Sequence, residues 1–182
     1  MDDAYIGGVH PGKHGRGAAG KVMILVAAEA KGCGMGRIRL AQVADGSAVQ
    51  MEAFVRSAVG AGAGIVTDGN RSYNGLRALG YRHAVSPMHE AAGREEKMLP
   101  RAHRVVALLK RWLLGIHQGA VSQAHLPYYL DEYTFRFNRR TSRHRGKLFF
   151  RLLQQAMVIS PATYSHVVNP IRSRRHLKLH HP

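Results

Sequence analysis

The order of the apolar segments in the first 85 residues constrains the fold more than any other feature of the sequence. Three short segments, bounded by glycine and rich in β-branched or alternating apolar residues, come first, and a helical pattern behind Ser47 follows them. A fourth such segment precedes a short helical stretch around Arg71 to Leu79, and a fifth comes after it. The predicted strands are residues 4–6, 21–30, 36–44, 63–67 and 81–85. This alternation predicts an α/β fold, with a helical remainder after residue 100.

The same order resembles that of the ribonuclease H-like, or integrase-like, fold, in which helices flank a mixed five-stranded sheet. A chain of 182 residues suits one domain. We therefore expect a ribonuclease H-like domain over residues 1–160, with a truncated first strand and a helical C-terminal part. Residues 161–182 are basic and poor in apolar side chains, so a flexible tail is expected there.

The chain is strongly basic, and its charge is unevenly placed. Lys and Arg number 27 against 11 Asp and Glu, which gives a net charge of +16. Residues 101–182 carry 15 basic and 2 acidic side chains, whereas residues 1–100 carry 12 and 9. A surface of this kind attracts polyanions, so nucleic acid is the expected partner.

The cysteine content and the apolar runs indicate the compartment. The single cysteine, Cys33, excludes a disulfide framework and a cysteine-rich zinc module, and fits a reducing environment. The longest purely apolar stretch, residues 22–28, is too short to cross a bilayer, and no signal peptide pattern precedes it. We expect a cytoplasmic protein that associates with the nucleoid.

Acidic side chains at the predicted strand ends are the candidate metal ligands. Asp2 and Asp3 open the first strand, Asp68 ends the fourth, and the pair Glu95 and Glu96 lies in a later loop. Hard divalent cations need several converging oxygen ligands. An aspartate before Gly-Asn is more often a turn former, and two aspartates at a terminus are more often solvated. The predicted fold brings the two strand ends side by side, which favours the ligand interpretation for Asp2 and Asp68.

The predicted helix over residues 101–116 has two faces. At 100° per residue the apolar residues on one side are Val105, Leu108, Leu109, Trp112 and Ile116. His103, Ala107 and Lys110 share the other side, together with Leu114. His103 and Lys110 are either solvated surface residues or a metal ligand and a phosphate contact on one face.

The segment that follows combines an apolar stripe with a basic cluster. Its stripe, predicted to be core, consists of Leu126, Tyr129, Leu130, Tyr133 and Phe137. Six basic residues then crowd into twelve positions, which favours contacts with DNA phosphates. They are Arg136, Arg139, Arg140, Arg143, Arg145 and Lys147.

Three motifs resemble those of bacterial insertion-sequence transposases of the DDE superfamily, ISXO-type, which carry an integrase-like catalytic domain. "DDAYIGG" resembles the family's D-E-x-Y-I-G-G, and "VTDGNRSYNGLRALGYRH" resembles its T-D-x-x-x-x-Y-x-x-L…G-Y-x-H. The most specific is "LLKRWLLGIHQGAVSQAHLPYYLDEYTFRFNRR", which resembles the family's L-L-K-R…G-x-H…H-L-x-x-Y-L-D-E-x-x-F-R-x-N-R-R. Together they span nearly the whole chain.

The resemblance implies the residues of a metal-dependent active site. The family's two catalytic aspartates fall on Asp2 and Asp68, and its third metal position, usually glutamate, falls on His103. A basic residue seven positions later falls on Lys110, and Arg111 beside it joins the expected DNA contacts. The implied activity is cleavage and strand transfer at insertion-sequence ends, with Mg²⁺ or Mn²⁺ and as a homo-oligomer on DNA.

Two departures from the family pattern leave alternatives open. Histidine at the third position suits Mn²⁺ better than Mg²⁺, so His103 is either a ligand or a proton acceptor, and Glu95 or Glu96 would then supply an oxygen. The family's N-terminal zinc-ribbon region is not part of the sequence, and Asp2 stands at the start of a central strand. Either the true start lies upstream, or the chain is an inactive remnant that only binds nucleic acid.

Overall fold

The computed structural model describes residues 1–7, 21–86, 99–118, 121–161 and 163–168. Five strands, five α-helices and one 3-10 helix lie in these ranges. The strands are β1 (Asp2–Ile6), β2 (Val22–Lys31), β3 (Gly34–Val43), β4 (Gly64–Thr67) and β5 (Arg82–Val85). The helices are α1 (Ala48–Ala58), η1 (Arg71–Leu76), α2 (Pro100–His117), α3 (Leu126–Asn138), α4 (Arg145–Val158) and α5 (Tyr164–Val168). The predicted α/β order is confirmed, and β1 begins two residues earlier than expected, at Asp2.

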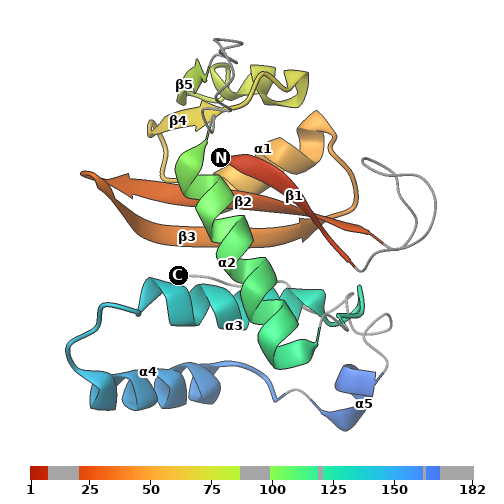
Figure 1. Cartoon of the computed structure of the whole chain (residues 1–182), viewed down its shortest axis with the longest axis vertical. Helices are drawn as coiled ribbons and strands as arrows, with labels where there is room; N and C mark the ends of the chain where they lie inside the picture. The colour runs from red at the N-terminus through yellow and green to blue at the C-terminus, as the bar shows by residue number, and fades with distance from the viewer. Residues whose placement is uncertain (8–20, 87–98, 119–120, 162, 169–182) are drawn as a thin grey trace.

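The strands pair in two groups. β2 pairs antiparallel with both β1 and β3, whereas β4 pairs parallel with β5 (Figure 1). Among the described residues, backbone pairing therefore gives a three-stranded and a two-stranded sheet, and the single five-stranded sheet that we expected is not confirmed. The terminal ammonium of Met1 donates a hydrogen bond to the carbonyl of Val66 at 2.6 Å, which brings the start of β1 against β4.

Burial on both faces explains why β2 is apolar without alternation. Ile24 and Val26 point to one side, where they pack with α2 and α3, and Met23 and Leu25 point to the other, where they pack with α1 and η1. All four are at most 6% exposed. Strands covered on both faces read as continuous apolar runs, and each fully buried side chain of this size contributes about 1.5–3 kcal/mol. The strand is the centre from which both cores extend.

The apolar face of α2 is confirmed in part. Val105 and Leu109 are buried, and Leu108 and Trp112 pack against the same core. Ile116, which the helical wheel placed on the same apolar side, is 58% exposed. It lies in the last turn of α2, which extends beyond the sheet (Figure 1). The buried stripe instead includes two residues that the helical wheel did not select, Ala102 and Leu113.

The apolar stripe of α3 is confirmed as core. Leu126, Leu130 and Tyr133 are buried, with Tyr129 and Phe137 packed against them. Among the described residues, Phe137 is the last that contributes to either core, and the described side chains of α4 and α5 contribute none. Several large apolar side chains of α4 are accordingly exposed, among them Phe149 and Met157. None of the described helices is both long and apolar enough to span a membrane.

The outer edge of β3 is closed by side chains rather than by another strand. The amide of Asn138 accepts from Ile38 N–H at 2.7 Å and donates to Ile38 C=O at 3.0 Å. Arg140 donates to the carbonyls of Met35 and Gly36. An exposed strand edge invites further pairing, so these bonds both satisfy and protect it.

Replacing Asn138 by alanine is expected to lower the free energy of unfolding by about 1–3 kcal/mol, because two backbone groups of Ile38 lose their partner. Urea unfolding followed by circular dichroism measures this. The exposed Asn74 supplies the matched control, and its change to alanine is expected to stay within about 0.5 kcal/mol. Equal stability of the two variants would contradict the edge-closing role of Asn138.

Candidate metal centre

Strand alternation places Asp2 on the buried face of β1. Ala4 and Ile6 pack into the core beneath α2, and Asp2 shares their side of the strand. Asp2 is only 9% exposed, and its Oδ1 accepts the backbone N–H of Asp3 at 2.9 Å. A charged side chain this deeply buried has a structural or functional partner as a rule.

The end of β4 positions Asp68. Thr67 is fully buried, and its hydroxyl lies 2.8 Å from the Asp68 carbonyl and 2.8 Å from Nε2 of the buried His83 on β5. The Asp68 carboxylate then accepts the N–H of Asn70 at 3.3 Å, which is the local bond of an Asx turn. Asp68 is therefore a turn residue, and the same turn fixes where its carboxylate lies.

The carboxylates of the two strand ends converge. Oxygens of Asp2, Asp3 and Asp68 all lie within 4.8 Å of one another. Asp3 was one of the candidates, but the ligand interpretation was favoured only for Asp2 and Asp68, and alternation would direct Asp3 to the opposite face of β1 from Asp2. Strict alternation of side chains between the two faces does not hold at the end of a strand. The two consecutive aspartates of "DDAYIGG" were the sequence feature that pointed to Asp3 as a ligand.

His103 joins this group from α2. The helix starts at Pro100, and His103 in its first turn places Nε2 3.0 Å from Oδ2 of Asp2. Its side chain is 45% exposed, so one side of the imidazole faces solvent. The structure thus brings together the three predicted residues Asp2, Asp68 and His103, which lie far apart in the sequence. Glu95 and Glu96 lie outside the described residues.

The electrostatics of Asp2 fit a site that holds a cation. Burial raises the pKa of Asp2 above its usual value; the Asp3 N–H and His103 oppose this shift, and the nearby Asp68 adds to it. Carboxylates that crowd and desolvate one another are stabilised by a positive ion between them. Carboxylate oxygens suit Mg²⁺, and the imidazole of His103, which contacts Asp2 but is not one of the three converging groups, would favour Mn²⁺ as a ligand. The residues present therefore fit a divalent cation.

The family model of the ISXO2-like transposase domain matches residues 1–138 of this chain. The chain belongs to this family. The matched range holds the three converging aspartates and His103, and it ends one residue beyond the last core residue. No curated protein matches the sequence significantly. The chain thus carries an insertion-sequence transposase domain, a type of domain that serves transposition and DNA recombination.

The predicted DNA contacts of this transposase domain fall into two groups. Exposed side chains on α2 and in and beside α4 form the first: Lys110, Arg111, Arg143 and Lys147. In the second group, Arg136 pairs with Glu132 at 2.8 Å, and Arg139 stacks on the Phe135 ring at 3.8 Å. Arg140 donates to the edge of β3, which makes it a structural residue in this fold. Arg145 opens α4, and its side chain lies outside the described set.

Acidification is expected to destabilise the support beneath Asp68 through His83. Burial, followed by the nearby charge of Arg77, lowers the pKa of His83. Its neutral form is thus favoured in the folded state, so stability is full above the unfolded pKa of about 6.5 and falls as the pH drops below it. His83→Gln keeps a donor for Thr67 without a titrating ring. Thermal unfolding at pH 7.5 and pH 5 should show a larger loss for the wild type, and parallel losses would contradict this origin.

Proposed function

We propose that the chain is a DNA transposase that cleaves insertion-sequence ends and transfers the freed strand to a target duplex by metal-dependent phosphoryl transfer. The observation that supports this best is the convergence of Asp2, Asp3 and Asp68 within 4.8 Å, with His103 against Asp2. A basic protein that only packs DNA has no need for three converging carboxylates of which one, that of Asp2, is buried. The net charge of +16 supplies attraction to the substrate.

The proposed domain is ribonuclease H-like, with β1 and β4 as neighbours. The bond from the Met1 ammonium to Val66 supports this, because it joins β1 to β4 directly before Asp2 and Asp68. The bond lies where β1 begins and β4 ends, next to the converging carboxylates of Asp2 and Asp68.

Each residue of the site has a proposed task. Asp2 and Asp68 would hold the cations, and Asp3 lies close enough to share in this. Bound Mg²⁺ or Mn²⁺ would supply the activation of the attacking hydroxyl and the stabilisation of the leaving oxygen. His103 either completes the ligand set or accepts the proton of the attacking hydroxyl from its solvent-facing side.

The DNA is proposed to run along the exposed face of α2. Lys110 lies two turns beyond His103 on that face, about 10 Å along the axis, and would bind a phosphate next to the scissile one. Arg111, Arg143 and Lys147 would extend the contact by charge alone, so they position DNA and do not read its sequence. We expect assembly as a homo-oligomer on the two element ends, within the nucleoid.

Changing Asp68 to asparagine is expected to abolish Mn²⁺-dependent nicking of duplex DNA while binding is kept. Loss of a ligand should lower the rate by at least about 100-fold, beyond the roughly 10- to 100-fold that loss of an outer partner costs. The same variant should lose the rise in melting temperature that Mn²⁺ gives the wild type. Asp45→Asn, at an exposed turn, is the matched control. A wild type that binds DNA but nicks with neither Mn²⁺ nor Mg²⁺ would instead be the inactive remnant.

His103→Glu is expected to move the metal preference from Mn²⁺ toward Mg²⁺, because it replaces an imidazole by a carboxylate in the same turn of α2. The ratio of nicking rates in the two metals measures this. His103→Gln, with neither imidazole nor carboxylate, should be slow in both. An unchanged ratio in the glutamate variant would remove His103 from the ligand set.

A further inference from the structure

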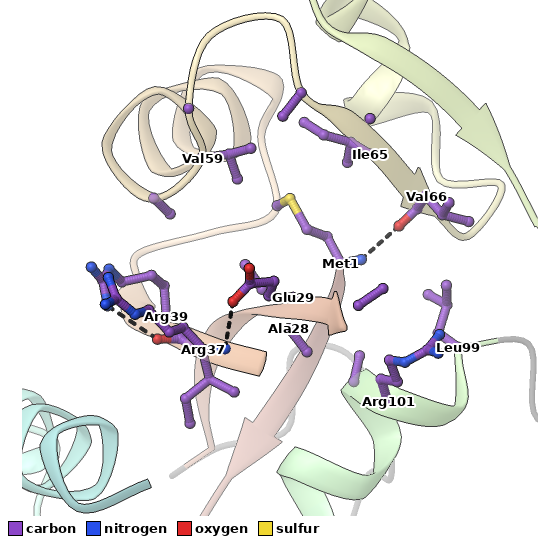
Figure 2. Close-up of a pocket in the computed structure, with 18 of the residues that line it drawn as sticks. Met1, Ala28, Glu29, Arg37, Arg39, Val59, Ile65, Val66, Leu99 and Arg101 are labelled. Atoms are coloured by element: carbon purple, nitrogen blue, oxygen red, sulfur yellow. Dashed lines mark hydrogen bonds between the residues drawn. The ribbon is translucent and has the colours of Figure 1, made fainter. Parts of the chain in front are cut away.

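Two arginines that the DNA contacts above do not include stand side by side on β3. Arg37 and Arg39 flank the buried Ile38 and are both exposed. Alternation puts them on the α1 side of the sheet, with Ala41 and Val43 of the same core. Figure 2 shows both side chains at one side of a pocket of about 650 Å³, whose lining also includes Met1 and Val66.

The edge of β3 brings a third guanidinium to the same place. Asn138 bonds both backbone groups of Ile38, so the end of α3 lies directly beside the segment that carries Arg37 and Arg39. Arg139 comes next in the chain and is held by its stacking on Phe135. Burial, and then the positive charges of Arg37, Arg151 and Arg39, lower the pKa of Arg139. Arg151 of α4 is the fourth member.

These four arginines are called here the β3 arginine cluster, and within the described ranges no ion pair joins any of them to a carboxylate. The ion pairs His103–Asp2 and Arg136–Glu132 both lie outside the cluster. Glu29 lies beside the cluster, where its Oε2 accepts the backbone N–H of Arg37 at 2.8 Å. Even if Glu29 offsets one charge, three remain. Guanidinium groups gathered in this way cost free energy unless an anion compensates them.

The backbone that carries Arg39 lies near the start of β1, although alternation directs the side chains of Arg39 and Asp2 to opposite faces of the sheet. Asp2 pairs with Val26, Val26 pairs with Leu40, and Leu40 follows Arg39. With neighbouring strands about 4.8 Å apart, the backbone of Arg39 is roughly 10 Å from that of Asp2. The pocket extends from Arg37 and Arg39 toward that region, because its lining also includes Met1, which precedes Asp2, and Leu99, whose carbonyl accepts the N–H of His103.

We infer that the β3 arginine cluster binds the phosphodiester backbone of DNA beside the cleavage site, on the β3 side of the carboxylates. The inference rests on the proposed function, since DNA is the substrate there. Guanidinium groups bind phosphate oxygens in pairs, and the stacked Arg139 is already ordered for that role. The contact is independent of sequence, and it gives the duplex a second hold besides the face of α2 that carries Lys110.

The test is the salt dependence of DNA binding, measured without metal on a short duplex by fluorescence anisotropy. Arg37→Gln and Arg39→Gln are each expected to reduce the slope of log K against log salt by about 0.9, and the double variant by about twice that. Arg37→Lys with Arg39→Lys keeps the charge and should keep the slope. Arg82→Gln, an exposed arginine of β5, is the matched control and should leave the slope unchanged.

Slopes of the Arg37 and Arg39 variants equal to that of the Arg82 control would overturn the inference. So would a change confined to binding of an RNA duplex of the same length. The rise in melting temperature with Mn²⁺ reports the carboxylates and is expected to persist in every variant. A wild type without Mn²⁺-dependent nicking, but with the predicted slope changes, would refute the proposed enzyme and leave the arginine site standing. The single variants decide the matter if circular dichroism shows that the double variant does not fold.

Discussion

Burial of β2 on both faces is the constraint on which the rest of the structure depends. Ile24 and Val26 anchor α2 and α3 on one side, while Met23 and Leu25 anchor α1 on the other. Because β1 pairs with this strand in a fixed register, the face that carries Asp2 is set by the same alternation. A slip of one residue would send Asp2 to the opposite face of the sheet. The precision of the site therefore originates in apolar packing rather than in contacts among the acidic residues.

The core must offset the cost of the carboxylate cluster. Two carboxylates separated by 4.8 Å repel each other by on the order of 3 kcal/mol at an effective dielectric constant near 20. Local hydrogen bonds hold them in place nevertheless: Asp3 N–H bonds Asp2, and the pair Thr67 and His83 fixes the strand end before Asp68. A folded state of this kind is poised to gain stability from a divalent cation, which is the basis of the metal-dependent melting proposed for the enzyme.

The sequence predicted the elements of this fold better than their assembly. The five strands and the stripes of α2 and α3 follow from periodicity, which the chain carries locally. Periodicity does not predict what happens where helices and strands end. Three features of the structure depend on those ends: the pairing of the strands into two groups, the exposure of Ile116 and the participation of Asp3. Strand-end positions and the helical wheel raised Asp2, Asp68 and His103 as candidates, and the family motifs gave them their roles; the structure explains their meeting by strand register and helix placement. The hydrogen bonds between Asn138 and Ile38 join residues 100 positions apart, so no local sequence pattern predicts them.

The motif "FRFNRR" shows why a count of basic residues overstates a DNA-binding surface. Asn138 and Arg140 of this motif use their donors on the edge of β3, and Arg136 pairs with Glu132. Of the basic residues in this motif, only Arg139 adds its charge to the β3 arginine cluster. The sequence pattern around Arg37 is that of an ordinary alternating strand, so it did not predict a role for Arg37 in binding. Charge matters for binding where the fold gathers it without neutralising it, because counterions are released only from phosphates that such groups reach. By that criterion the first role of the end of α3 is to cover the edge of β3. Its contribution to DNA binding is the charge of Arg139, which this contact brings next to Arg37 and Arg39 of β3.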